Sequence, residues 1–240
     1  MKPLTRVQLV WYDVVRNVVA GFCRLFWRLR VDGAGNVPAD GPFILAPVHR
    51  SNIDTPLVCA ISGRRLRYMG KDAMWKYRWS AWFFTSLGGF PVRRGSADRD
   101  ALRSCLEVLA GGEPLVMFPE GTRRSGPLVE SLFDGAAYVA IRAGVPIVPV
   151  GIGGSEEAMP KGARMIRPVR VTMVVGRPLY PEPGGSGRAS RRAVRQLTDR
   201  LAKELQALYD EAQVKAGAAS PWRMLRRRFR TGSDGGRTAA

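Results

Sequence analysis

Residues 5–29 carry a helical pattern of polar and apolar positions. At roughly 100° per residue, the polar side chains gather within about a third of the helix circumference, and the remainder is almost entirely apolar. The polar group consists of Arg6, Asp13, Arg16, Asn17, Arg24 and Arg28, and the apolar group includes Trp11, Val14, Val18, Phe22, Leu25, Phe26 and Trp27. So wide an apolar face beside arginines is typical of a helix that lies in a bilayer interface. The alternative is a helix packed on the core of the domain.

Short apolar runs alternate with helical stretches along the rest of the chain. The runs predict strands at 43–46, 66–69, 115–118, 147–152 and 169–175, and helices are expected at about 55–61, 73–86, 97–110, 131–143 and 189–213. This alternation predicts an α/β fold, a single domain with a mixed, largely parallel sheet flanked by helices. We expect an N-terminal amphipathic, membrane-associated helical segment over 1–32, the α/β domain over 33–214 and a basic C-terminal tail over 215–240.

The helix expected at 189–213 has two distinct faces. One is basic and the other is aliphatic, with Arg188, Arg191, Arg192, Arg195 and Lys203 on the first and Val194, Leu197, Leu201, Leu205 and Leu208 on the second. A solvated face over a core face explains this pattern. The tail that follows places Trp222, Leu225 and Phe229 among arginines, which suits either an anionic bilayer surface or a disordered segment.

Charge narrows the choice of partner. The 240 residues include 38 Lys and Arg but 20 Asp and Glu, which gives a formal net charge of +18. This excess indicates an anionic partner: nucleic acid, an anionic membrane surface or a phosphorylated substrate. We expect neither a membrane-spanning helix nor export, because no apolar stretch reaches about 18 residues and no signal peptide is present. The three cysteines lack metal-ligand spacing and fit a reduced, cytoplasmic compartment.

Candidate chemistry begins where the first apolar run ends. His49 is the only histidine, and Asp54 follows five residues later. On one continuous helix the two side chains would point about 140° apart, but they can meet across a strand–turn–helix junction. Thr55 as N-cap and Pro56 at the first helical position predict that a helix starts there. A carboxylate bonded to one imidazole nitrogen fixes the tautomer, so that the other nitrogen can take a proton from a hydroxyl.

Two further segments at strand ends carry arginines. The segment Phe118–Arg123 reads Phe-Pro-Glu-Gly-Thr-Arg, and Arg123 is suited to hold a phosphate through two parallel hydrogen bonds. Glu120 is expected to orient that arginine or the turn. The segment Gly88–Gly95 places two more arginines after a glycine turn. Loops that converge on one sheet edge are the usual geometry of an α/β active site, and the alternative is a set of ordinary surface loops.

Together these segments resemble the glycerolipid acyltransferases, the family that includes 1-acylglycerol-3-phosphate and glycerol-3-phosphate acyltransferases. The family's first motif, His, four residues and Asp, is matched by His49–Asp54. Its second, which runs from Gly to Arg, resembles Gly88–Arg94, and its third is matched in full by Phe118–Arg123. Its fourth, a hydrophobic strand with prolines, is matched by Val145–Val150. The four motifs occur in the family's order and cover roughly residues 40–155.

The resemblance implies a role for each matched residue. His49 would be the general base that activates the acceptor hydroxyl, and Asp54 would orient it. The substrate-binding set would comprise Arg94 and Arg123 on the acceptor phosphate, with Lys71, Gly88, Glu120, Gly121 and Thr122 beside them. The hydroxyl would attack the thioester directly, with no covalent enzyme intermediate, no cofactor and no metal.

The resemblance also implies the substrates. Acyl-CoA or acyl carrier protein would be the donor, and lysophosphatidic acid, a glycerol phosphate lipid, would be acylated to phosphatidic acid in phospholipid synthesis. Glycerol-3-phosphate is the alternative acceptor, and acyl-thioester hydrolysis is the alternative reaction. Arg93 and Asp134 stand where the family often has Asp and Lys, which leaves the acceptor open. The expected location is peripheral (monotopic), on an anionic surface at the cytoplasmic side of the cell membrane.

The segment Met74–Phe84 carries three tryptophans with cations between them. It is expected to line a tunnel for the acyl chain or to lie at headgroup level, and the alternative is an aromatic core helix. No nucleic-acid partner is expected, because no recognised nucleic-acid-binding fold or aromatic–basic RNA motif is present. An inactive lipid-binding relative is difficult to reconcile with the presence of His49, Asp54 and Glu120 together.

Overall fold

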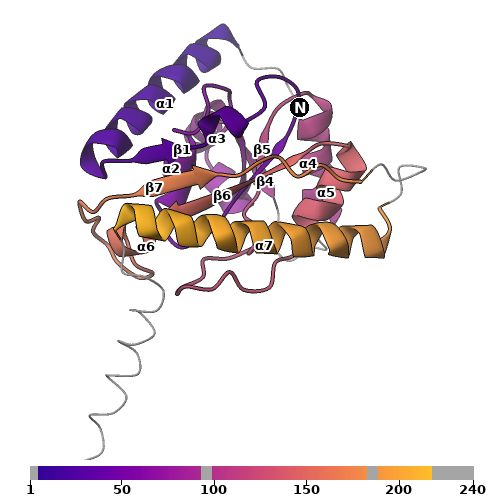
Figure 1. Ribbon diagram of the computed structural model, residues 1–240. Coiled ribbons are helices and arrows are strands. Elements are labelled where there is room, and N and C mark those ends of the chain that lie inside the picture. Colours follow the sequence, from indigo (N-terminus) through magenta and orange to yellow (C-terminus); the bar gives the residue numbers. More distant parts are fainter. Residues whose placement is uncertain (1–4, 93–98, 183–188, 218–240) are drawn as a thin grey trace, which may run out of the picture.

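The computed structural model describes residues 5–92, 99–182 and 189–217 (Figure 1). At the centre of that part lies a seven-stranded sheet with the order β1-β7-β6-β2-β5-β3-β4. The strands are β1 (Arg30–Asp32), β2 (Ile44–Pro47), β3 (Arg67–Lys71), β4 (Gly89–Val92), β5 (Leu115–Val116), β6 (Ile147–Gly153) and β7 (Thr172–Val175). From β6 to β4 all neighbours are parallel, whereas β7 runs antiparallel to β6. The predicted α/β fold with a mixed, largely parallel sheet is confirmed.

Helices cover the sheet. They are α1 (Arg6–Phe26), α2 (Asp54–Val58), α3 (Arg78–Ser86), α4 (Arg99–Ala110), α5 (Gly135–Ala143), α6 (Ser155–Ala158) and α7 (Arg191–Ala216), with 3-10 turns η1 (Ala34–Asn36) and η2 (Asp72–Trp75). Each helix expected from the sequence has a counterpart, but the one expected at 73–86 divides into η2 and α3, and α6 was not predicted. The edge strands β1 and β4 were not predicted: β1 has three residues, and β4 contains Gly and Pro, which disfavour a strand assignment.

The start of α2 corrects one prediction. The helix begins at Asp54, with Ile53 at the N-cap position, and Thr55 does not cap it. The Asp54 carboxylate instead accepts hydrogen bonds from the backbone N–H groups of Arg50 and Ser51, at 2.6 and 2.7 Å. These bonds from the carboxylate to the preceding turn, and not a Thr55 cap, set the junction between β2 and α2.

The long helix α7 lies across β6 and β7 in the front of Figure 1. Its predicted aliphatic face is buried, from Val194 through Leu197, Leu201 and Leu205. Its basic residues Arg191, Arg192, Arg195 and Lys203 are exposed, while Arg188 and residues 218–240 of the basic tail lie outside the described residues. The reading of a solvated face over a core face is confirmed for the described part of this helix.

The helix α1 presents most of its apolar face outward. Thr5 and Gln8 form a capping box at its start, and Tyr12, Ala20 and Cys23 are the side chains that it buries. Arg16, one of the polar group, points inward and donates to the carbonyl oxygen of Gly63. The outward side carries exposed aliphatic and aromatic residues: Val7, Val10, Val14, Val18, Phe22 and Leu25, the last 83% exposed. Packing of this face on the core is therefore ruled out.

No helix in the described ranges has the length and apolar character needed to cross a bilayer.

We predict that Gly151→Ala will destabilise the fold strongly. A Cβ atom at this position in β6 would lie 2.2 Å from the carbonyl oxygen of Leu208 in α7, so the helix backbone would have to move. The expected loss is about 1–3 kcal/mol or more, seen as a lower melting temperature in circular dichroism. Gly21→Ala in α1 is the control, because a Cβ there meets no atom within 4 Å and the change should stabilise by about 0.5–1 kcal/mol. Equal melting temperatures for the two variants would contradict this packing.

Candidate active site

The candidate site lies at the carboxyl ends of β2 and β5, which are adjacent and parallel in the sheet. The chain leaves β2 at Pro47 and reaches His49 two residues later, and it leaves β5 at Val116 and reaches Glu120. The backbone N–H of Arg124 donates to the carbonyl oxygen of His49 at 2.9 Å, which joins the two loops directly. Two of the segments predicted to converge therefore do so.

The predicted pairing of His49 with Asp54 is present. Nδ1 of His49 lies 3.0 Å from Oδ2 of Asp54, whose side chain is fully buried. That oxygen also accepts from the backbone N–H groups of Arg50 and Ser51. Because a carboxylate accepts and does not donate, Nδ1 carries the proton and Nε2 has a free lone pair. The imidazole is 18% exposed, so Nε2 belongs to a ring that a substrate can reach.

The imidazole ring is also held by packing. It stacks on Phe118, with ring centroids 4.1 Å apart and an interplanar angle of 28°. Phe118 belongs to the Phe-Pro-Glu-Gly-Thr-Arg segment, so this segment fixes the ring plane as well as contributing polar groups. Stacking from one side and the Asp54 carboxylate at Nδ1 together restrict the ring to one orientation.

Glu120 has a different role from the one expected. It is completely buried, accepts from the backbone N–H of His49 at 2.7 Å, and forms an ion pair with Arg50 at 2.5 Å. It therefore orients Arg50 and the His49 turn, and does not bind Arg123. Arg50 was not predicted as a site residue. The sequence signal that could have identified it is the pair of opposite charges, Arg50 and Glu120, that follow the neighbouring strands β2 and β5.

Arg50 remains charged in this environment. Burial would lower the pKa of its guanidinium, but the adjacent Glu120 carboxylate more than offsets that effect, so the pKa lies above its ordinary value. Nη2 donates to the carbonyl oxygen of Leu128 at 2.9 Å, and the guanidinium carbon lies 4.8 Å from the centre of the Tyr209 ring. One buried cation thus connects both site loops with α7.

The helix α7 holds the loop that follows the third motif. Gln206 accepts from the N–H of Val129 at 2.7 Å and donates to the carbonyl oxygen of Pro127 at 3.1 Å. The Tyr209 hydroxyl donates to the carbonyl oxygen of Gly126 at 3.2 Å and accepts from Gln213 at 2.8 Å. These residues were not predicted, because α7 reads as an ordinary core helix and its loop contacts depend on the tertiary fold.

The remaining third-motif residues lie beside His49. Gly121 has φ +64 and is packed against Phe133, whose ring a Cβ would meet at 2.6 Å, so this position requires glycine. Gly121 and Thr122 are exposed, and Arg123 is half-buried. Within the described part of the chain Arg123 forms no ion pair or hydrogen bond, whereas Arg124 pairs with Glu130 at 3.0 Å. The Arg123 guanidinium is thus available to an anion next to the His49 loop.

Other predicted residues are placed as follows. Gly88 precedes β4 at the amino-terminal ends of the parallel strands, whereas His49 follows the carboxyl end of β2, so the two residues do not adjoin. A Cβ at Gly88 would meet the carbonyl oxygen of Leu66 at 2.3 Å. The backbone of Lys71 ends β3, and its side chain lies outside the described part. Arg93 and Arg94 lie outside the described residues. Asp134 accepts from the Thr198 hydroxyl at 2.8 Å, which gives this departure from the family pattern a structural explanation.

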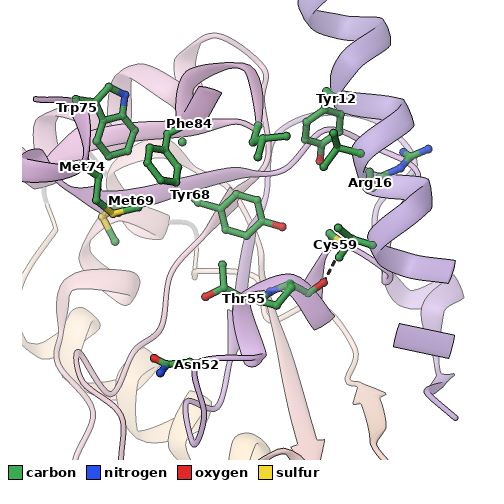
Figure 2. Close-up of a pocket in the computed structure, with 16 residues that line it drawn as sticks. Tyr12, Arg16, Asn52, Thr55, Cys59, Tyr68, Met69, Met74, Trp75 and Phe84 are labelled. Atoms are coloured by element: carbon green, nitrogen blue, oxygen red, sulfur yellow. Dashed lines mark hydrogen bonds between the residues drawn. The ribbon is translucent and has the colours of Figure 1, made fainter. Parts of the chain in front are cut away.

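A largely apolar cavity of about 670 Å³ adjoins the site (Figure 2). Asn52 and Thr55, which flank Asp54 in the chain, line it on one side, and α1, β3 and the segment from η2 to α3 line the others. Met74, Trp75 and Phe84 line the cavity, whereas Trp79 and Trp82 are exposed. The aromatic segment therefore divides between a cavity wall and an outer surface.

The cysteines offer no competing nucleophile. All three are free, and burial raises the pKa of Cys23 to about 11 and the pKa values of Cys59 and Cys105 to about 12. The reactive thiolate is therefore scarce near neutral pH. Within the described ranges no group of His, Cys, Asp and Glu is arranged to hold a metal ion.

Comparison with known proteins shows the family of the chain. Residues 28–153 match the family model described as Acyltransferase, which spans His49, Asp54 and the third motif. The chain is 26% identical over 159 residues to a chloroplastic 1-acyl-sn-glycerol-3-phosphate acyltransferase of Arabidopsis thaliana, covering 65% of this chain and 44% of that protein. It is 26% identical over 170 residues to the Bacillus subtilis protein named 1-acyl-sn-glycerol-3-phosphate acyltransferase, covering 70% and 82%. The chain thus spans less than half the length of the plant relative.

A solved structure has the same fold. The 1-acyl-sn-glycerophosphate (LPA) acyltransferase of Thermotoga maritima superimposes with a TM-score of 0.67 at 27% identity, covering 85% of this chain and 83% of that one.

We predict that Glu120→Gln will unfold the site at a large energetic cost. The change keeps the side-chain size but leaves Arg50 buried without its counter-charge, which costs about 3–5 kcal/mol of unfolding free energy. Glu107→Gln is the matched control, since Glu107 pairs with Arg103 on the exposed face of α4 and its loss should cost less than about 1 kcal/mol. Chemical denaturation of both variants measures the difference, and similar losses would contradict the role given to Glu120.

Proposed function

The chain belongs to the acyltransferase family, and we propose on that premise that it acylates lysophosphatidic acid to phosphatidic acid, with acyl-CoA or acyl carrier protein as donor. The observation that carries the proposal is the His49–Asp54 pair, with Nδ1 held by the carboxylate and Nε2 left free. The names of the plant, Bacillus and Thermotoga relatives support lysophosphatidic acid as the acceptor.

The chemistry follows from the imidazole tautomer. Nε2 of His49 takes the proton of the acceptor hydroxyl while its oxygen attacks the thioester carbonyl carbon. The tetrahedral intermediate collapses, the carbon–sulfur bond breaks, and the imidazolium returns the proton to the leaving thiolate. An ester and a free thiol result, and the enzyme is unchanged. Asp54 stabilises the imidazolium in both steps, as a buried carboxylate does in a hydrolase triad.

The acceptor phosphate is assigned to the loop after β5. Arg123 is half-buried beside the His49 loop, and no described carboxylate neutralises it. Arg50 lies closer in sequence to His49 but is committed to Glu120, so it is excluded as a phosphate ligand. Arg94 and Lys71 remain expected contributors from the neighbouring strand ends. A planar guanidinium can bind two phosphate oxygens at once, which would also fix the orientation of the glycerol hydroxyl.

The fatty acyl chain is assigned to the apolar cavity. Its volume of about 670 Å³ lies within the range of small-molecule sites, and its lining is mainly aliphatic, aromatic and sulfur-containing. Asn52 and Thr55 place its mouth beside the catalytic turn. A chain that enters there leaves its thioester at the mouth, where His49 and the acceptor meet.

A bilayer surface is assigned to the outward side of α1 and α3. Exposed Val14, Val18 and Leu25 form an apolar stripe on α1, with Arg6 and Arg24 on its flank. Trp82 of α3 lies 6.1 Å from Trp11 of α1, so the two exposed surfaces are continuous. An apolar stripe flanked by cations suits a peripheral location on an anionic membrane, and we place it at the cytoplasmic face.

We predict that His49→Ala will lower acyl transfer by about 10²–10⁴-fold, the usual contribution of a general base. Purified protein is assayed with palmitoyl-CoA and either lysophosphatidic acid or glycerol-3-phosphate, and phosphatidic acid, acylated glycerol phosphate and free palmitate are quantified. The proposal requires phosphatidic acid as the main product. Palmitate as the main product would establish a hydrolase, and a fully active His49→Ala protein would refute the mechanism. Circular dichroism shows whether the variant is folded.

We predict that Val18→Asp will weaken vesicle binding by about tenfold or more, because a charge replaces an apolar group in the membrane-facing stripe. Val214→Asp on α7 is the matched control, since Val18 and Val214 are each 67% exposed. Co-sedimentation with vesicles of phosphatidylglycerol and phosphatidylcholine measures both. Equal weakening by the two changes would show that α1 is not the membrane-binding surface.

A further inference from the structure

The cavity wall contains several polar groups, and the protein itself satisfies nearly all of them. The Tyr12 hydroxyl accepts from the backbone N–H of Leu66 at 2.9 Å. Trp75 Nε1 donates to the Thr85 hydroxyl at 3.0 Å, and Arg16 donates to the carbonyl oxygen of Gly63. The Cys59 thiol contacts the carbonyl oxygen of Pro56 at 2.8 Å. Each of these groups has at least one hydrogen-bond partner within the protein.

Among the buried polar groups of the described lining residues, the Tyr68 hydroxyl is the one without a partner, whereas Asn52 and Thr55 are exposed. The Tyr68 hydroxyl oxygen is buried, lines the cavity and has no hydrogen-bond partner in the described chain. Figure 2 shows the phenol projecting from β3 into the space between Thr55, Cys59 and Tyr12. Burial, with smaller effects of Tyr12 and Cys59, raises the pKa of Tyr68 well above its ordinary value, so the group is a neutral O–H donor. A buried hydroxyl left unpaired costs about 1–3 kcal/mol.

We infer that the Tyr68 hydroxyl is a specificity-determining donor for an acyl chain that carries a hydroxyl group near its carboxyl end. The inference rests on the proposed function, because it assumes that the cavity holds the acyl chain. A hydroxyl on the chain accepts from Tyr68 and removes the cost of the unpaired group, whereas a plain methylene chain leaves it unpaired. Sites built to pair with a substrate hydroxyl discriminate against the analogue that lacks it.

The position of the hydroxyl on the chain follows from the lining. Thr55, which follows Asp54 in the chain and is exposed, lines the cavity, and Cys59 lines it one turn further along, about 6 Å at the rise of a helix; the Tyr68 phenol points between the two (Figure 2). The donor therefore meets the first few carbons of an entering chain. Met74, Trp75 and Phe84 line the cavity without an unpaired buried group, so they suit the plain part of the chain.

The test compares donors and variants. Wild type, Tyr68→Phe and Tyr12→Phe are assayed with palmitoyl-CoA, 3-hydroxypalmitoyl-CoA and 16-hydroxypalmitoyl-CoA. We expect the ratio of kcat/KM for the 3-hydroxy donor to that for the plain donor to fall about tenfold in Tyr68→Phe. The ratio should change by much less in Tyr12→Phe, because the Tyr12 hydroxyl already has a partner in the backbone N–H of Leu66, from which it accepts. The 16-hydroxy donor should gain nothing from Tyr68.

Calorimetric binding of palmitate and 3-hydroxypalmitate separates this inference from the proposed function, because it needs no turnover. Wild type should bind the 3-hydroxy acid at least as tightly as palmitate. In Tyr68→Phe, the affinity for 3-hydroxypalmitate relative to that for palmitate should be about tenfold lower than in wild type. If no donor is turned over but this preference is found, the proposed function fails and the donor role of Tyr68 stands. If transfer occurs with the same donor ratio in wild type and Tyr68→Phe, the inference is overturned and the proposed function stands.

Discussion

The buried ion pair between Arg50 and Glu120 is the constraint on which the site depends. Removing two charges from water is expensive, and their attraction compensates only when the remaining hydrogen-bonding groups are also satisfied. Here Glu120 takes the N–H of His49, and Arg50 reaches Leu128 and the Tyr209 ring, so few arrangements of the two loops satisfy both charges. The pair therefore acts mainly by selecting one geometry, and the position of His49 follows from it.

The helix α1 separates two apolar environments. Its inner side contributes Tyr12 and Val19 to the cavity wall, and its outer side exposes Val14 and Val18. With the outer side on a bilayer, as proposed, this helix would keep the cavity within one helix diameter of the lipid, about 10 Å. The arrangement explains why a segment that is apolar over most of its circumference is stable here: one part packs on the domain, and the other suits lipid. Arg16, from the polar stripe, faces inward because the carbonyl of Gly63 provides a partner.

The sequence was sufficient to predict the fold class and the His49–Asp54 pair, because short apolar runs, helical periods and motif spacing are local signals. It was insufficient where a residue's role depends on a distant partner. Arg50 pairs with a residue 70 positions away, and Gln206 contacts a loop 77 positions away. For the same reason Glu120 was expected to orient Arg123 or its turn, whereas the arginine that it binds is Arg50. Thr55 was expected to cap α2 on local preference, but the turn is set by the Asp54 carboxylate.

The strand order has a consequence for how the protein is made. β2 lies between β6 and β5 in the sheet, so the strand that leads into His49 has neither neighbour until much later segments leave the ribosome. The helix α7 follows both β5 and β6 in the chain. The Arg50 guanidinium is covered only when this helix folds over β6. A nascent chain therefore passes through a period in which Arg50 is still hydrated and the sheet is incomplete. The site is completed only when α7, the last described helix, packs on the sheet, so a ribosome-bound or truncated chain without α7 would lack an ordered site.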